Sequence, residues 1–198
     1  MDKLFFDELQ SLISMNIKIF DNISKKEKAD DLVLFHFSTL KKSYFVTEGF
    51  IQLLKLDNFD ASYSLIRINL EVMIRVYALD VVESKNKYAS DIIHEDKELN
   101  KFLYHNCEEK GIITERSIVK KLSKLSDFNW VEKTYNQGNF FTHFSNRSLY
   151  SSMEIEHNEK SINLHWGNIL SITDKQKAIN IMCQIIKGIH FFTQKHYD

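Results

Sequence analysis

The chain has 198 residues and a formal net charge of −1, with 43% hydrophobic and 27% charged side chains. It contains no proline and five glycines, whereas average usage would give about ten and about fourteen. This composition excludes collagen-like chains, proline-rich linkers and turn-rich barrels or sandwiches, and the balanced charge excludes a global field that would attract nucleic acid or a membrane. Long helices are the remaining solution.

The beginning of the chain does not resemble a secretion signal, because Asp2, Asp7 and Glu8 stand where such a signal needs a basic start and an apolar run. The chain has no uncharged apolar stretch of about 18 residues, so we expect no transmembrane helix. Cys107 and Cys183 form no C-x-x-C pair and are expected to be free thiols in a reducing compartment. We therefore expect a cytoplasmic protein without a membrane contact.

Apolar side chains recur at helical spacing through the first half of the chain. The pattern predicts amphipathic helices over residues 3–23 and 31–56. A third helix is predicted over residues 59–83, and its apolar side chains cover nearly all its sides, which is typical of a central, buried helix. The short connections between these helices indicate antiparallel neighbours in a bundle.

The second half of the chain continues with helical patterns and one alternating pattern. Helices are predicted over 87–110 (a polar surface helix), 114–126, 128–145 and 173–196. Thr114 is a suitable N-cap for the second of these. Residues 152–166 alternate between apolar and polar side chains, which predicts a small β-hairpin. The whole chain, 1–198, is thus expected to form an all-α, single-domain helical bundle with a small hairpin insertion.

One narrow polar stripe runs along the otherwise apolar third helix. At about 100° per residue its members lie within about 80° of one another: Asp60, Ser64, Arg67, Glu71 and Arg75. Glu71 is four residues from each arginine and can pair with both, and the triplet Arg67, Glu71 and Arg75 has a net positive formal charge. Three interpretations fit. The stripe is an ion network that fixes helix register, the solvent-facing edge of the helix, or part of a cleft in which Arg67 or Arg75 binds an anion such as a phosphate.

A second polar group occurs on the predicted helix 128–145. Asn139, His143 and Arg147 follow one another at a spacing of four and would share one face. Histidine is the usual general acid–base near neutral pH, and Arg147 could stabilise a developing negative charge. Alternatively, His143 is a hydrogen-bonded, half-buried histidine between aromatic neighbours.

Residues 138–143 (GNFFTH) resemble the motif of the HEPN superfamily, whose small helical bundles include many metal-independent ribonucleases of toxin–antitoxin and antiviral systems. That motif consists of an arginine, usually a polar residue, three further residues and a histidine. Asn139 and His143 match its last parts, whereas Gly138 stands in place of the arginine. Glycine in a helix costs up to about 1 kcal/mol relative to alanine. Either another part of the backbone approaches closely where the glycine has no side chain, or the active site has been lost.

An uncharacterised bacterial family of helical proteins is also similar over roughly residues 31–150. Its internal helix carries Arg-x-x-x-Glu, here Arg67 to Glu71. Its late Tyr…His motif followed by Ser corresponds here to Tyr135, His143 and Ser145.

The HEPN resemblance implies a ribonuclease of toxin or antiviral-defence type with RNA as its partner. His143 would act as acid–base on the ribose 2′-OH or the leaving group, and Asn139 would orient it. Arg67, Arg75 or Arg147 would stabilise the phosphorane. The alternative is a non-catalytic helical module in a bacterial or phage defence or regulatory system. It would bind a protein partner or a small anionic ligand through Arg67, Glu71, Arg75 and Tyr135.

Three further expectations concern partners and metals. Aromatic side chains favour a homodimer or line a ligand pocket, with Phe140, Phe141 and Phe144 as candidates. A basic face either touches RNA phosphates or is simply solvated, and its members are Arg116, Lys120, Lys121 and Lys124. The eight histidines form no H-E-x-x-H pattern, so no metal site and no cofactor are expected.

Overall fold

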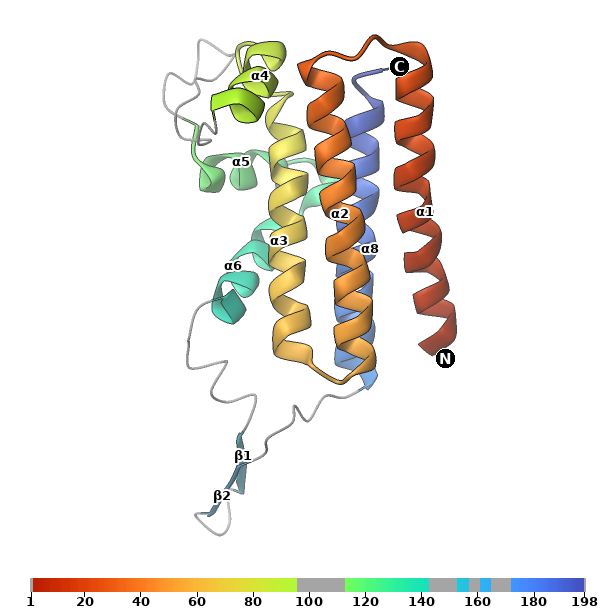
Figure 1. Ribbon diagram of the computed structural model, residues 1–198. Helices are drawn as coiled ribbons and strands as arrows, with labels where there is room; N and C mark the ends of the chain where they lie inside the picture. Colours follow the sequence, from red (N-terminus) through yellow and green to blue (C-terminus); the bar gives the residue numbers. More distant parts are fainter. Residues whose placement is uncertain (1, 96–112, 143–152, 157–160, 165–171, 198) are drawn as a thin grey trace.

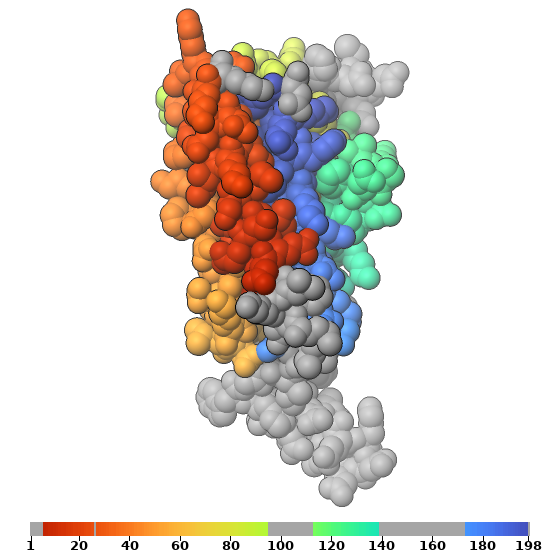
Figure 2. Space-filling view, turned by 90° about the vertical axis from the view of Figure 1, so that its right-hand side faces the viewer, coloured from red at the N-terminus to blue at the C-terminus, as the bar shows by residue number. Residues whose placement is uncertain are grey.

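The computed structural model describes residues 2–95, 113–142, 153–156, 161–164 and 172–197, and seven α-helices lie within these ranges. Its four longest helices run side by side as a bundle (Figure 1): α1 (Asp2–Lys26), α2 (Asp31–Lys55), α3 (Phe59–Ala78) and α8 (Ile172–Gln194). On the outer face of the bundle, α1 lies between α2 and α8 (Figure 2). The predicted all-α bundle is confirmed.

Helix α3 is the central element of this bundle, as its apolar pattern predicts. It contacts α2 and α8 on one side and two shorter helices on the other. Ile66, Leu70 and Met73 are fully buried along it. Because a buried side chain of this size contributes roughly 1.5–3 kcal/mol when it leaves water, α3 holds the surrounding helices around one common core.

The prediction that the third helix extends to residue 83 is wrong. Helix α3 ends at Ala78, whose carbonyl accepts hydrogen bonds from the N–H groups of both Val81 and Val82. Ser84 then begins a new helix, α4 (Lys85–Glu95), because its hydroxyl accepts the N–H of Lys87 at 3.3 Å in the manner of an N-cap. The first part of the predicted helix 87–110 is therefore α4, and residues 96–110 lie outside the described part.

Two short helices pack on the side of α3 that faces away from α1 (Figure 1): α5 (Glu115–Leu122) and α6 (Val131–Thr142), with a 3-10 turn at Ser126–Phe128 between them. The predicted helix 114–126 ends four residues early. The Ser123 hydroxyl donates to the Val119 carbonyl and accepts the N–H of Glu132, which turns the chain into α6. The predicted helix 128–145 begins three residues later than expected, and its last three residues are not among those described.

Two four-residue strands are described within the 152–166 segment. β1 (Met153–Glu156) and β2 (Ser161–Leu164) pair antiparallel, with Met153 opposite Leu164 and Glu156 opposite Ser161. None of the described helices is long and apolar enough to cross a membrane. Cys183 is a buried free thiol on α8, whereas Cys107 lies outside the described residues.

Candidate functional site

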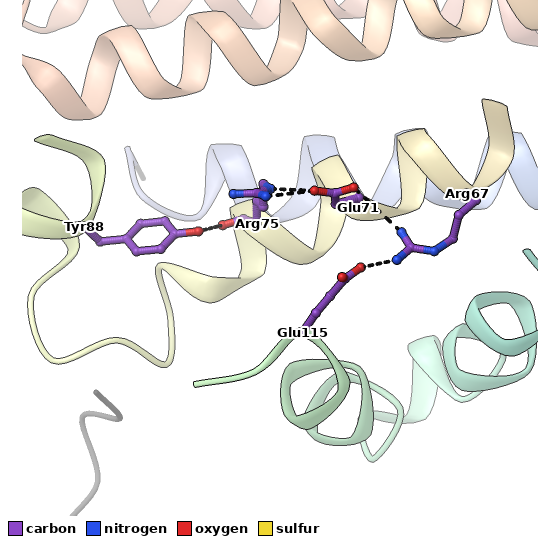
Figure 3. Close-up of polar contacts among 5 residues, drawn as sticks. All are labelled: Arg67, Glu71, Arg75, Tyr88 and Glu115. Atoms are coloured by element: carbon purple, nitrogen blue, oxygen red, sulfur yellow. Dashed lines mark hydrogen bonds and ion pairs between the residues drawn. The ribbon is translucent and has the colours of Figure 1, made fainter. Parts of the chain in front are cut away.

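The arginines of the polar stripe meet on Glu71, as their spacing predicts (Figure 3). Arg75 donates from Nε and Nη2 to Glu71 Oε1 at 3.0 and 2.8 Å. Arg67 Nη1 lies 3.9 Å from Glu71 Oε2, an ion pair longer than a hydrogen bond. At the beginning of the stripe, Ser64 donates to the backbone carbonyl of Asp60 at 3.0 Å.

Arg67 has a closer partner that the sequence did not reveal. Its Nη2 donates to Glu115 Oε1 of α5 at 2.5 Å (Figure 3), and its side chain is only 12% exposed. The guanidinium also lies over the ring of Tyr135 on α6, with Cζ 4.5 Å from the ring centroid. Arg67 therefore ties α3 to both α5 and α6 through one ion pair and one cation–π contact.

The position of Glu115 follows from local chemistry. Thr114 and Ser117 form a capping box, in which each side chain bonds the backbone of the other and fixes the start of α5. Glu115 then stands in the first turn, where the helix dipole favours a negative charge. It is the one acidic side chain among the eight residues of α5. This lone acid beside a capping threonine marks the first turn of α5, but helix packing decides which side chain it meets.

The inclusion of Glu115 changes the charge of the site. Arg67 and Arg75 carry two positive charges, and Glu71 and Glu115 carry two negative charges, so that the four side chains are neutral together. The net positive charge of the triplet Arg67, Glu71 and Arg75 is thus compensated by Glu115. Arg67 is buried and paired, so it ties the helices together and adds no net positive charge to the site.

Arg75 lies in a different environment, because its side chain is 36% exposed. It lines a cleft of 660 Å³ between α2, α3 and α4. Burial by itself lowers the pKa of Arg75, but the hydrogen bond and the charge of Glu71 outweigh this effect and raise the pKa above its ordinary value. The guanidinium is therefore permanently charged and held in place at the cleft wall. The backbone carbonyl of Arg75 accepts a hydrogen bond from the hydroxyl of Tyr88 at 3.4 Å (Figure 3).

The cleft around Arg75 combines polar and apolar walls. Lys42, Ser38 and Glu71 supply polar groups. The apolar wall consists of Phe35, Ile68, Val72, Ile92 and Ile93. Lys42 was not identified from the sequence, since an exposed lysine on an amphipathic helix has no distinguishing pattern.

The second predicted group lies largely beyond what the structure describes. Asn139 lies on α6, but its side chain is outside the described part of the structure. His143 and Arg147 lie entirely outside the described residues. The three aromatic candidates for a dimer surface, Phe140, Phe141 and Phe144, also have no described side chains.

Gly138 provides the link between the two predicted groups. A Cβ atom at this position would stand 3.0 Å from both Cβ and Cδ of Arg67. Arg67 thus packs against the residue that takes the place of the motif arginine in the resemblance. The basic face of α5 points elsewhere: Arg116, Lys120 and Lys124 are exposed and Lys121 is half-buried.

Comparisons with known proteins return nothing that names this site. No protein-family model, curated protein or solved structure matches the chain. The resemblance to HEPN proteins accordingly stays a prediction from the sequence.

Proposed function

We propose that this protein is a helical binding module whose cleft between α2, α3 and α4 takes a small ligand with an apolar body and an anionic group. The observation that carries the proposal is the position of Arg75, which is fixed by Glu71 and partly exposed at the wall of a mostly apolar cleft. A cleft of 660 Å³ is within the range of about 300–1,000 Å³ that small-molecule sites occupy.

The donors of Arg75 support an anionic ligand. A guanidinium has five N–H donors, and Glu71 takes two of those on Arg75. The remaining donors form a planar fork that suits a carboxylate or a phosphate. Among the described residues, no side chain is paired with the ammonium of Lys42, which lines the same cleft. Arg75, Lys42 and Glu71 together give the cleft one net positive charge.

The apolar wall of the cleft favours a ligand that has an apolar part as well as an anionic group. Phe35, Ile68 and Val72 cover one part of the cleft and Ile92 and Ile93 of α4 another. Burying apolar ligand surface against them contributes roughly 25 cal/mol per Å². A ring or a short aliphatic body attached to a phosphate or carboxylate would use both kinds of wall.

Thermal unfolding with three probes at equal ionic strength tests the class of ligand. Phenyl phosphate has a ring and an anion, inorganic phosphate lacks the ring, and phenol lacks the anion. At ten times its Kd a ligand adds about 1.4 kcal/mol to stability, which for this size is a rise in Tm of about 3–6 °C. We expect the largest rise with phenyl phosphate. Equal effects of all three probes would contradict the proposal.

A metal-independent ribonuclease is the second candidate, favoured by the contact between Gly138 and Arg67. Arg67 brings a guanidinium to the helix that leads to His143, and so stands beside the place where the motif would carry its own arginine. In this function His143 would exchange protons with the ribose 2′-OH or the leaving group, Asn139 would orient it, and Arg67 would stabilise the phosphorane.

Incubation of the purified protein with total RNA and tRNA in the presence of EDTA tests this second function. Wild type is compared with His143→Ala, and with Arg67→Lys, which keeps the charge but loses the planar fork. If the protein is a ribonuclease, the wild type cleaves RNA and the His143→Ala variant does not. Absence of cleavage by wild type removes this candidate and leaves the binding module unaffected.

A further inference from the structure

Helix α2 carries an exposed surface that contains three large apolar side chains and a lysine. Leu34, Phe37, Lys41 and Phe45 follow one another at spacings of three, four and four residues and share one face. We call these four residues the α2 ridge. Leu34 is 43% exposed, Phe37 is 37% exposed and Phe45 is 60% exposed. The ammonium of Lys41 lies 5.8 Å from the ring centroid of Phe37.

The α2 ridge borders an apolar groove between α1 and α2. The groove has a volume of 260 Å³, and Ile17 and Phe20 of α1 line it opposite the ridge. Phe20 and Phe37 are in contact, with ring centroids 4.5 Å apart, whereas Ile17 is 54% exposed. Helix α1 and the adjoining edge of α2 form one continuous surface in Figure 2. An apolar groove beside exposed aromatic side chains is typical of a surface that another protein covers.

We propose that a second copy of this chain covers the α2 ridge, with the two α2 helices antiparallel across a two-fold axis. In such an interface residue i of one copy contacts residue j of the other, and j contacts i. The order of side chains on the ridge fits this rule. With the axis near residue 39, Leu34 faces the partner's Phe45, and Phe37 faces the partner's Lys41.

The chemistry of these pairs selects the antiparallel arrangement. An apolar side chain meets an apolar side chain at each end of the ridge. In the centre a lysine meets an aromatic ring, and this repeats the cation–π contact that Lys41 already makes with Phe37 within the chain. A parallel arrangement would instead place Lys41 against the partner's Lys41, and like charges in contact disfavour that pairing. The ridge is thus complementary to itself.

The first test is the mass of the protein in solution, measured by light scattering and sedimentation over two orders of magnitude in concentration. Wild type is expected to dimerise, and Phe45→Glu is expected to be monomeric. The control Leu125→Glu places the same charge on another exposed apolar residue, 41% exposed, between α5 and α6, and is expected to remain dimeric. A monomeric wild type overturns the proposal, whether or not it then binds another protein or lipid vesicles.

The second test is disulfide trapping in a background with Cys107→Ser and Cys183→Ala. A disulfide requires Cα atoms within about 7 Å. The proposed axis brings residue 34 to the partner's residue 45, whereas the two copies of residue 34 are separated by about 16 Å along the helices. The double variant Leu34→Cys, Phe45→Cys is therefore expected to form a covalent dimer, and Leu34→Cys alone is not. Equal cross-linking of both variants would overturn the antiparallel arrangement.

Discussion

Gly138 of α6 lies directly against Arg67 of α3, so closely that a Cβ atom on the glycine would be 3.0 Å from both Cβ and Cδ of the arginine. The missing side chain lets the two helices approach. The absence of a side chain also leaves room for the Arg67 side chain beside α6, and Arg67 contacts Tyr135 and Glu115. This contact accounts for a glycine inside a helix, where it would otherwise cost up to about 1 kcal/mol relative to alanine.

Gly138→Ala is expected to destabilise the protein although alanine is the better helix former. The new methyl group would press on Arg67 Cβ, which is part of the rigid base of that side chain. Overpacking typically destabilises by about 1–3 kcal/mol. The better helix propensity of alanine offsets about 1 kcal/mol of this, which leaves a net loss of up to about 2 kcal/mol. Urea unfolding measures the difference.

Gly49→Ala on α2 is the matched control for this substitution. Among the described residues, its added Cβ would meet Leu65 Cδ1 at 3.2 Å, and this atom is the far end of a flexible side chain. We expect Gly49→Ala to be neutral or stabilising. If the two alanine variants changed stability alike, the close approach at Gly138 would not be the reason for its glycine.

Arg67→Gln tests whether the buried arginine has a structural role. Its loss leaves Glu71 and Glu115 without their common cation and removes the contact with Tyr135. Removing one partner of a buried pair costs about 3–5 kcal/mol, and the partial exposure of both glutamates, 39% and 29%, reduces this to roughly 2 kcal/mol.

A double-mutant cycle with Glu115→Gln measures the pairwise part of that cost. Because the two side chains are in contact, their combined effect is expected to be smaller than the sum by about 0.5–3 kcal/mol. Arg116→Gln is the control, since Arg116 is the exposed neighbour of Glu115 and is expected to matter by less than about 0.5 kcal/mol. Strict additivity of Arg67→Gln and Glu115→Gln would contradict the structural role.

The stability of the protein is expected to fall as the pH drops below 6.5, the ordinary pKa of histidine. His36 is fully buried, and burial, with His196 and Lys85 nearby, lowers its pKa to about 3. Burial also lowers the pKa of His190 to about 4. Below pH 6.5 the unfolded chain takes up protons that the folded chain does not, so each histidine removes stability at up to about 1.4 kcal/mol per pH unit.

His36→Phe isolates one of these two contributions. The ring contacts of His36 are with the rings of Phe35, His196 and Tyr197, so an aromatic replacement suits the site. Unfolding free energies between about pH 7 and about pH 5 should fall less steeply in the variant, by the slope of one histidine. An unchanged slope would show that His36 does not remain neutral in the folded protein.

The helices themselves were largely predictable, because long apolar patterns without proline leave few alternatives. The prediction 31–56 differs from α2 by one residue, and 173–196 differs from α8 by one residue at its start and two at its end. The failure at the end of α3 has a local cause. Val81 and Val82 continue the apolar pattern, but their N–H groups bond the Ala78 carbonyl in a turn, and Ser84 then caps α4. Periodicity does not contain that information.

The candidate site was predictable only within one helix. Spacing along α3 was sufficient to pair Glu71 with both arginines, because i,i+4 neighbours meet whatever the tertiary fold. Glu115 and Lys42 come from other helices, 48 residues after Arg67 and 33 residues before Arg75. Whether such side chains meet is decided by helix packing, which a single sequence does not specify at this precision.

Isothermal titration with phenyl phosphate is the most direct test of the Arg75 cleft as a binding site. Wild type is titrated beside Lys42→Gln, which removes a cleft cation, and Lys124→Gln, which removes an exposed cation at the end of α5. We predict one saturable site in wild type and in Lys124→Gln. In Lys42→Gln the affinity should be weaker by roughly tenfold, as the loss of a charge-assisted hydrogen bond implies. Equal affinity in all three proteins, or no saturable binding to wild type, would contradict the account.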